Sequence, residues 1–193
     1  KMADLKSLNS IYFLLVISCI VSYASIVGYL HNGADMMVKR FGFEVNVAGS
    51  RLALIYGIAA FGSPLLGILV DKIGKRGLLM FFSAFFVIFA HLTICVMEDS
   101  VAPFANNTIV YPLVAMGIFY AIYTTLIWPS ISLVCDKKLR GTAYGFAGSM
   151  QAGGLAILSV ANGWIHDHTM EVHKGYFWTE VFLLTLSVIA LVI

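Results

Sequence analysis

The stretch Gly67-Ile68-Leu69-Val70-Asp71-Lys72-Ile73-Gly74-Lys75-Arg76 separates two long apolar runs, at residues 48–70 and 78–97. A helix needs about 20 apolar residues to cross the hydrocarbon core of a bilayer, and each run provides them. The stretch itself concentrates four charges and two glycines in ten positions. Such a composition is typical of a tight turn at the membrane surface. We therefore expect membrane helices joined by short polar turns.

The composition of the whole chain supports this expectation. Of its 193 residues, 60% are hydrophobic and 11% are charged, and the mean hydropathy is +0.91. Because a soluble domain carries about a quarter charged residues, a soluble enzyme and a disulfide-rich secreted fold are excluded. The three cysteines lack ligand spacing, and a net charge of +2 gives no basis for nucleic-acid binding. We expect no metal site, no cofactor and no nucleic-acid partner, and we expect the lipid bilayer as the surroundings.

Six apolar runs predict an all-α membrane protein, with one six-helix transmembrane bundle over residues 1–193. The runs lie at about residues 11–30, 48–70, 78–97, 111–135, 142–165 and 177–193. The last run has only about 17 residues, the lower limit for a span. We therefore expect the natural chain to continue beyond it.

Basic residues predict the orientation of the bundle, because cytosolic loops carry an excess of Lys and Arg. One side holds eight of the twelve basic residues: Lys1, Lys6, Lys72, Lys75, Arg76, Lys137, Lys138 and Arg140. This side is predicted to be cytosolic, with both chain termini on it. The sequon Asn106-Asn107-Thr108 then lies on the lumenal side, where Asn106 is a candidate glycosylation site, although such a short pattern is common by chance.

The quoted turn also carries a family signature. It matches every fixed position of G-x-L-x-D-[RK]-x-G-[RK]-[RK], the signature loop of the major facilitator superfamily, and the chain resembles that family. Gly67 allows a close helix approach, Gly74 allows a tight reversal, and Asp71 has basic partners within five residues. We expect the loop to act as a conformational gate that stabilises one closed cytosolic arrangement; its residues are Gly67, Asp71, Lys72, Gly74, Lys75 and Arg76. The alternative is a generic basic hairpin.

Further motifs narrow the resemblance. Trp128-Pro129, the segment from Gly141 to Phe146, Gln151 and the segment from Gly154 to Ile157 are similar to the C-terminal six-helix half of the lysosomal dipeptide transporter branch. The resemblance implies half of a transporter fold and uniport of dipeptides from the lysosome or another endomembrane compartment. It also implies a glycosylated single-span accessory protein as a partner. The polar stretch from His31 to Asp35 departs from the pattern, which leaves the ligand open.

Polar side chains recur at helical spacing in three of the runs. They are Ser18, Ser22, Ser25, Tyr29 and Asn32 in the first run and Tyr120, Thr124 and Trp128 in the fourth. The stripe of the fifth run consists of Tyr144, Gly148, Gln151, Leu155 and Asn162, of which the tyrosine and the two amides are polar. In lipid, such stripes face other protein or a water-filled cavity. We predict a substrate cavity lined by Tyr29, Asn32, Arg51, Tyr120, Thr124, Trp128 and Gln151. For the serines and glycines, helix packing is the preferred alternative.

Charged and titratable residues near the spans leave alternatives open. Arg51 either snorkels to the lumenal surface or faces the cavity and holds a substrate carboxylate through two hydrogen bonds. His91 is either a proton-relay group or an interfacial histidine. The three histidines of the last lumenal loop have irregular spacing, which favours a solvated loop over a metal site.

Two functions of different classes fit these patterns. The first is a transporter half, secondary active or facilitative, that moves a small solute by alternating access against a second six-helix bundle, upstream in the same chain or in another copy. The second is a structural or accessory subunit of a larger membrane assembly. An intramembrane enzyme is not expected, because the sequence has no H-E-x-x-H or G-x-S-x-G motif.

Overall fold

The computed structural model describes residues 8–99 and 107–193, and all of its regular elements there are helices. In chain order they are α2 (Ser10–Phe41), α3 (Val45–Ile73), α4 (Arg76–Val96), α6 (Val110–Leu133), α7 (Arg140–His168), the short 3-10 helix η1 (His173–Gly175) and α8 (Tyr176–Val192). Asn106, Lys1 and Lys6 lie outside the described residues, so the predicted glycosylation site and part of the predicted orientation stay predictions.

Within residues 8–99 and 107–193, five helical segments are long and apolar enough to cross a membrane. They are α2, α3, α4, α6 and the segment His173–Val192, which contains α8. The remaining long helix, α7, has 29 residues but includes six glycines and several polar side chains, and it does not reach this level of hydropathy. The structure thus confirms an all-helical membrane protein. The described residues contain the six long helices that were predicted, but only five of the segments are apolar enough to count as membrane spans.

The first helix runs well beyond its predicted end. We expected it to stop near residue 30, where the apolar run ends, but it continues to Phe41. His31, Asn32 and Asp35 are compatible with helix, and the helix ends only where Gly42 adopts a left-handed conformation with φ 68°. There the Phe43 N–H donates to the Met37 carbonyl at 3.1 Å, which is a Schellman cap. Hydropathy marked the end of the apolar core, and not the end of the helix.

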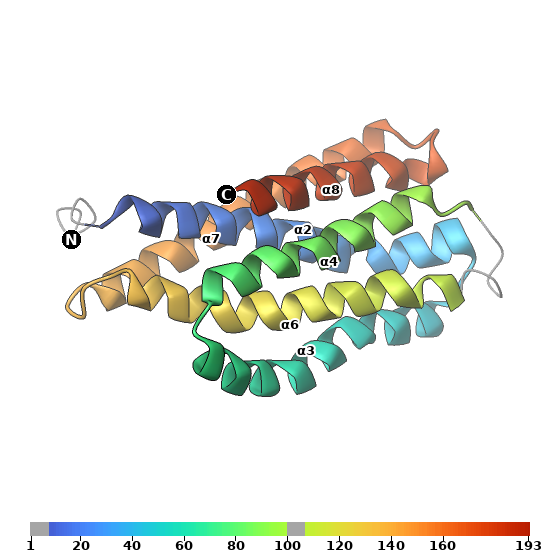
Figure 1. Ribbon diagram of the computed structural model, residues 1–193. Helices are drawn as coiled ribbons and strands as arrows, with labels where there is room; N and C mark the ends of the chain where they lie inside the picture. Colours follow the sequence, from blue (N-terminus) through green and yellow to red (C-terminus); the bar gives the residue numbers. More distant parts are fainter. Residues whose placement is uncertain (1–7, 100–106) are drawn as a thin grey trace.

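The other five long helices agree with the predicted runs within three residues at each end. The helices lie along one another as an elongated bundle (Figure 1). In it, α6 packs along both α3 and α4, α2 packs along both α7 and α8, and α4 packs on α8. The first turn of α2, the start of α4 and the end of α8 meet at one end, where Ile11, Gly77 and Ile193 line the same hollow.

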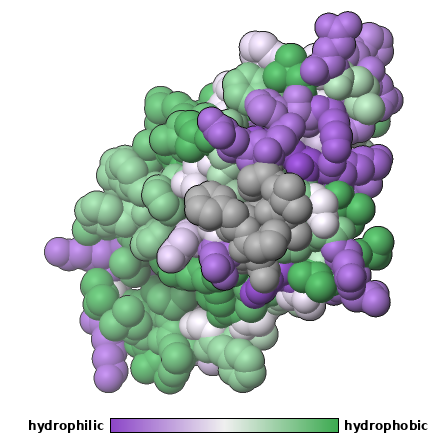
Figure 2. Space-filling view, turned by 90° about the vertical axis from the view of Figure 1, so that its right-hand side faces the viewer, coloured by the Kyte–Doolittle hydropathy of each residue, from purple (hydrophilic) through white to green (hydrophobic). Residues whose placement is uncertain are grey.

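The surface divides into a polar end and apolar flanks. Figure 2 looks at the end that carries the α7–α8 connection, and hydrophilic residues gather over the upper part of that end. On the flank, α4 exposes a row of phenylalanines: Phe81, Phe82, Phe85, Phe86 and Phe89. A continuous apolar surface of this kind suits contact with lipid.

Candidate functional site

Five aromatic side chains from four helices form one connected group, the aromatic cluster: Tyr23 of α2, Tyr56 of α3, Tyr120 and Trp128 of α6, and Tyr144 of α7. The Tyr120 ring meets the edges of two neighbours, with ring centroids 6.3 Å from Tyr23 and 6.2 Å from Tyr56. The Trp128 ring stacks on Tyr144 at 6.1 Å. Edge and offset contacts of this kind each contribute about 0.5–1.5 kcal/mol beyond burial. The cluster therefore joins the four helices at one place.

Hydrogen bonds fix the polar ends of the cluster. The Trp128 indole Nε1–H donates to the Tyr23 hydroxyl at 3.1 Å, and the Tyr144 hydroxyl donates to the Trp128 carbonyl at 2.9 Å. That carbonyl lies one residue before Pro129, in the part of α6 where proline perturbs the helical hydrogen bonds. The two bonds hold Trp128 between α2 and α7 with its ring partly accessible.

The cluster opens onto a face that the other helices leave uncovered. Tyr56 is 51% exposed, whereas Tyr23 is 9% exposed, so the group extends from the core to the surface. Its outer residues sit on α3 and α7, the long helices with the fewest buried side chains. A surface with aromatic faces, hydroxyl groups and an indole can bind an amphipathic solute through apolar, cation–π and hydrogen-bonding contacts.

Two of the predicted cavity residues belong to the cluster. Tyr120 and Trp128 share one face of α6, and Thr124 lies between them with its hydroxyl donating to the Tyr120 carbonyl at 2.7 Å. The other half-buried candidates are Asn32 on α2, Arg51 on α3 and Gln151 on α7. Both possibilities for Arg51 remain predictions.

Tyr29 does not join this group. It is 1% exposed and packs inside the bundle, where its ring meets the edge of the His91 ring with centroids 6.2 Å apart. The polar residues that begin at Ser18 therefore contact two different helices. Ser18 contacts the Tyr123 hydroxyl of α6 at 3.0 Å, whereas Tyr29 packs against His91 of α4. Because α2 is long and packs on several helices, residues at regular spacing along it contact different neighbours. Regular spacing therefore did not place these residues in one cavity.

His91 has a buried partner that the sequence did not indicate. Its Nδ1 lies 2.7 Å from Oε2 of Glu180, and the two side chains are 0% and 4% exposed. The histidine is therefore a core residue between α4 and α8 and not an interfacial one. Glu180 lies in the first turns of α8 and is the only Asp, Glu, Lys or Arg residue of that helix, which is the signal that could have indicated a buried partner.

The signature loop forms the turn between α3 and α4. Gly74 has φ 70° and ends α3, with its N–H donating to the Val70 carbonyl at 2.8 Å. Only glycine adopts this conformation without strain, which confirms the prediction of a tight reversal. Lys72, Lys75 and Arg76 are the basic residues next to Asp71 in the sequence. Of these, Arg76 contacts it, with Nη2 at 3.3 Å from Oδ1 of Asp71. Asp71 is three-quarters exposed, so this ion pair adds little stability by itself.

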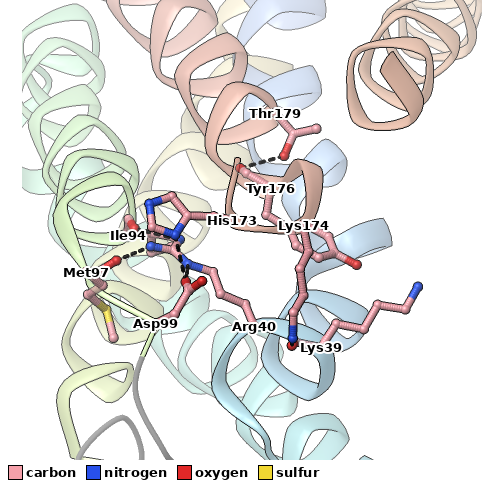
Figure 3. A network of polar contacts seen from close by, with 9 residues as sticks. All are labelled: Lys39, Arg40, Ile94, Met97, Asp99, His173, Lys174, Tyr176 and Thr179. Carbon is pink, nitrogen blue, oxygen red and sulfur yellow. Dashed lines mark hydrogen bonds and ion pairs between the residues drawn. The ribbon is translucent and has the colours of Figure 1, made fainter. Parts of the chain in front are cut away.

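A second polar network closes the opposite end of the bundle (Figure 3). The Arg40 side chain is fully buried; its Nε donates to Asp99 at 2.7 Å, and its other nitrogens donate to the carbonyls of Ile94 and Met97. His173 contacts the same Asp99 oxygen at 2.9 Å. Arg40 thus caps the last carbonyls of α4 and ties α2 to α4 and to the α7–α8 connection.

This network, the Arg40–Asp99–His173 clasp, holds a strained turn. His173 and Lys174 have φ 45° and 55°, which is unfavourable for residues with side chains. The Lys174 ammonium donates to the Lys39 carbonyl and helps to keep the turn in place. Burial would raise the pKa of Asp99, but hydrogen bonds from His173 and Arg40 outweigh it and hold the pKa below its ordinary value.

The remaining histidines of the connection bind locally. The His166 ring contacts Asp167 at 3.2 Å, and the His168 ring contacts the Trp164 carbonyl at 2.9 Å. In residues 8–99 and 107–193, no three His, Cys, Asp or Glu side chains are grouped as a metal site would need.

Comparison with known proteins gives one family and one set of relatives. The family model of the Major Facilitator Superfamily matches residues 9–193. The chain is 31% identical over 191 residues to the lysosomal dipeptide transporter MFSD1 of Danio rerio, covering 99% of this chain and 39% of that protein. It is 30% identical over 195 residues to MFSD1 of Gallus gallus, covering 100% and 41%, and 29% identical over 199 residues to MFSD1 of Homo sapiens, covering 100% and 39%. The chain thus spans about two fifths of the length of these relatives.

Proposed function

We propose a transport function from the premise that this chain belongs to the major facilitator superfamily. Its six long helices would all span the membrane and form one half of a transporter, with α7 as the sixth span despite its lower hydropathy. The observation that carries the proposal is the aromatic cluster, which opens onto the uncovered face of α3 and α7. A second six-helix bundle, upstream in the chain or in another copy, would cover that face.

The two flanks of the bundle differ in a way that supports this arrangement. The exposed side of α4 carries five phenylalanines, whereas α7 presents Gly145, Gly148 and Gly153 with open space around them. Small residues allow the backbone of another helix to approach closely, and bulky aromatic residues fill space beside lipid. The second bundle would therefore pack beside α7, and α4 would face the bilayer.

The substrate we propose is a dipeptide, carried across a lysosomal membrane. The matched relatives are named as lysosomal dipeptide transporters. A dipeptide carries an ammonium group, a carboxylate and two side chains. The aromatic cluster offers rings to the ammonium group and side chains, and Arg51, Asn32 and Gln151 are proposed to meet the carboxylate and the peptide bond. The single-span accessory protein stays a prediction from the resemblance.

Tyr56 gives the sharpest test of this surface, because it is half exposed and its removal leaves the core intact. In the intact protein reconstituted into liposomes, Tyr56→Ala should raise the KM for uptake of a neutral dipeptide about 5- to 10-fold, which corresponds to the loss of about one aromatic contact. Phe61→Ala is the matched control, because Phe61 is on the same helix and 82% exposed but outside the cluster.

Two results would count against the proposal. Equal KM values for Tyr56→Ala and Phe61→Ala would remove the aromatic cluster from the substrate path. Failure of the folded wild-type protein to carry any dipeptide, in liposomes that retain an internal dipeptide load, would favour the structural or accessory role instead.

A further inference from the structure

A groove of about 670 Å³, the α4–α6 groove, runs along the bundle between α4 and α6, which pack side by side (Figure 1). Its lining includes Phe85, Phe86 and Phe89 of α4, and Tyr111, Ala115 and Ile118 of α6. The five residues of the aromatic cluster are not among the lining residues. The groove is therefore separate from the proposed substrate surface.

The depth of the groove comes from one small residue between large ones. Ala115 is 6% exposed and forms the floor, whereas Phe89 of α4 and Tyr111 of α6 are 54% and 67% exposed. The phenylalanines of the groove also belong to the exposed row of α4, so the groove continues the apolar flank that suits contact with lipid. An empty gap beside hydrocarbon would forfeit van der Waals contacts, so a lipid molecule fills the groove in a membrane.

One end of the groove lies at a boundary of the membrane. Tyr111 is in the first turn of α6, three residues after Thr108, and the acidic Glu98 and Asp99 follow the end of α4. From Tyr111 the groove extends to Ile118, seven residues further along α6, which is a length of about 11 Å. An acyl chain needs about 15 Å to reach the middle of a hydrocarbon core of about 30 Å. The groove starts at the boundary and is too short for a whole acyl chain.

We propose that the α4–α6 groove binds a sterol, with its fused rings against Phe85 and Phe89 and its hydroxyl group beside Tyr111. A sterol is flat and rigid, so it fits between aromatic side chains and loses less conformational freedom on binding than an acyl chain does. Its single hydroxyl group lies at the membrane boundary, where the Tyr111 hydroxyl can form a hydrogen bond with it. The site goes beyond the proposed transport function and rests on that proposal only in that α4 faces the bilayer.

Packing and one hydrogen bond provide the free energy of binding. Lipid tails are as apolar as the groove, so a sterol that moves from the bilayer into it gains nothing from apolarity alone. The gain comes from close contact with Phe85, Phe89 and Ala115 and from the hydrogen bond at Tyr111, in surroundings with little competing water. Binding therefore depends on the shape of the groove and on one hydroxyl group, and removal of either should weaken it.

The test measures sterol binding directly and needs no dipeptide, so its failure and the failure of the transport proposal are distinguishable. The intact protein is reconstituted into phosphatidylcholine liposomes with increasing amounts of a cholesterol analogue that carries a photoreactive group and an alkyne tag. After illumination, labelled peptides from α4 and α6 are quantified, with unlabelled cholesterol and its 3α-hydroxyl epimer as competitors. A phosphatidylcholine with a photoreactive acyl chain is the parallel probe.

The expected result is saturable labelling of the groove peptides in wild type, with cholesterol competing at least about 3-fold better than its epimer. Tyr111→Phe removes only a hydroxyl group and should raise the half-saturating sterol content about 3- to 10-fold. Phe89→Ala should raise it at least about 3-fold through lost packing. Phe82→Ala is the matched control, because Phe82 is on the same helix and also 54% exposed but does not line the groove. This control should bind sterol as wild type does.

Labelling that rises in proportion to sterol content, without saturation or competition, would overturn the proposal, because the groove would then be an ordinary lipid contact. Equal half-saturating values for wild type and Tyr111→Phe, or equal losses in Phe89→Ala and Phe82→Ala, would reject it as well. Saturable labelling of the same peptides by the photoreactive phosphatidylcholine, weakened by Tyr111→Phe, would assign the groove to a phospholipid instead. The three substitutions change exposed side chains, so the core of the bundle stays intact in each.

Discussion

Gly117 tests whether the packing of α3 on α6 positions the aromatic cluster. A Cβ added at Gly117 would lie 2.9 Å from both Cβ and Cδ1 of Ile58 on α3. Cδ1 can rotate away, but Cβ is fixed to the backbone, so the helices must separate by about 0.5–1 Å to restore ordinary carbon contacts. Overpacking of this kind costs about 1–3 kcal/mol, and the better helix propensity of alanine returns up to about 1 kcal/mol. We expect Gly117→Ala to lower the free energy of unfolding by about 1–2 kcal/mol.

The same displacement should reach the substrate surface. Tyr120 lies one turn after Gly117, and its edge contact with Tyr56 is the link between α6 and the exposed part of the cluster. Denaturant unfolding of the intact protein and dipeptide uptake are measured side by side, with Gly77→Ala as the control, because a Cβ at Gly77 meets nothing within 4 Å and Gly77 lies on α4, away from the proposed second bundle. Weaker uptake should accompany the loss of stability. Equal stability of Gly117→Ala and Gly77→Ala would refute the packing argument.

Three further predictions concern the ends of the bundle. Asp71→Ala should lower dipeptide uptake several-fold while the unfolding midpoint changes little, because its exposed ion pair contributes at most about 1 kcal/mol; uptake equal to wild type in the folded variant would reject a gating role. Gly74→Ala should lower the free energy of unfolding by about 1–2 kcal/mol through left-handed backbone strain alone, since a Cβ at this position has open space around it. Gly77→Ala, where a Cβ also has open space, is the control and should show no comparable loss in thermal unfolding. The depressed pKa of Asp99 stabilises the folded state above about pH 4 and loses this effect as the pH falls further, so Asp99→Asn should flatten the acid limb of the stability curve below about pH 4; an unchanged limb would contradict the clasp.

The sequence was sufficient for the helices and for the α3–α4 turn, and the reasons are local. Apolar runs of bilayer length must be helical in lipid, because every backbone group needs a partner within its own segment. Gly74 could be placed at the reversal because a left-handed residue follows many helix ends. The end of α2 was missed because hydropathy reports the membrane boundary near residue 30, and Gly42, which ends the helix, lies twelve residues later.

The candidate site was only partly predictable. Tyr120 and Trp128 were found because their spacing places them on one face of a single helix. Tyr23 and Tyr56 were missed, since their role depends on how α2 and α3 are rotated against α6, and no pattern within one helix fixes that rotation. Tyr29 was misplaced for the same reason. Glu180 and His91 needed the pairing of α4 with α8, which their separation in the chain conceals.

The low hydropathy of α7 and the buried polar contact between α4 and α8 have a common explanation in the proposed assembly. A helix that faces lipid must be apolar on its outer side, and any titratable group that it carries must find its partner inside the bundle. Helix α4 fulfils both conditions, with phenylalanines outside and His91 in contact with Glu180 inside. Helix α8 fulfils them as well, because it exposes Val188 and Ile189 and buries Glu180. A helix between two bundles meets protein on both sides, so it can carry glycines and Gln151 in place of large apolar residues. The low hydropathy of α7 therefore agrees with its proposed position beside the second bundle.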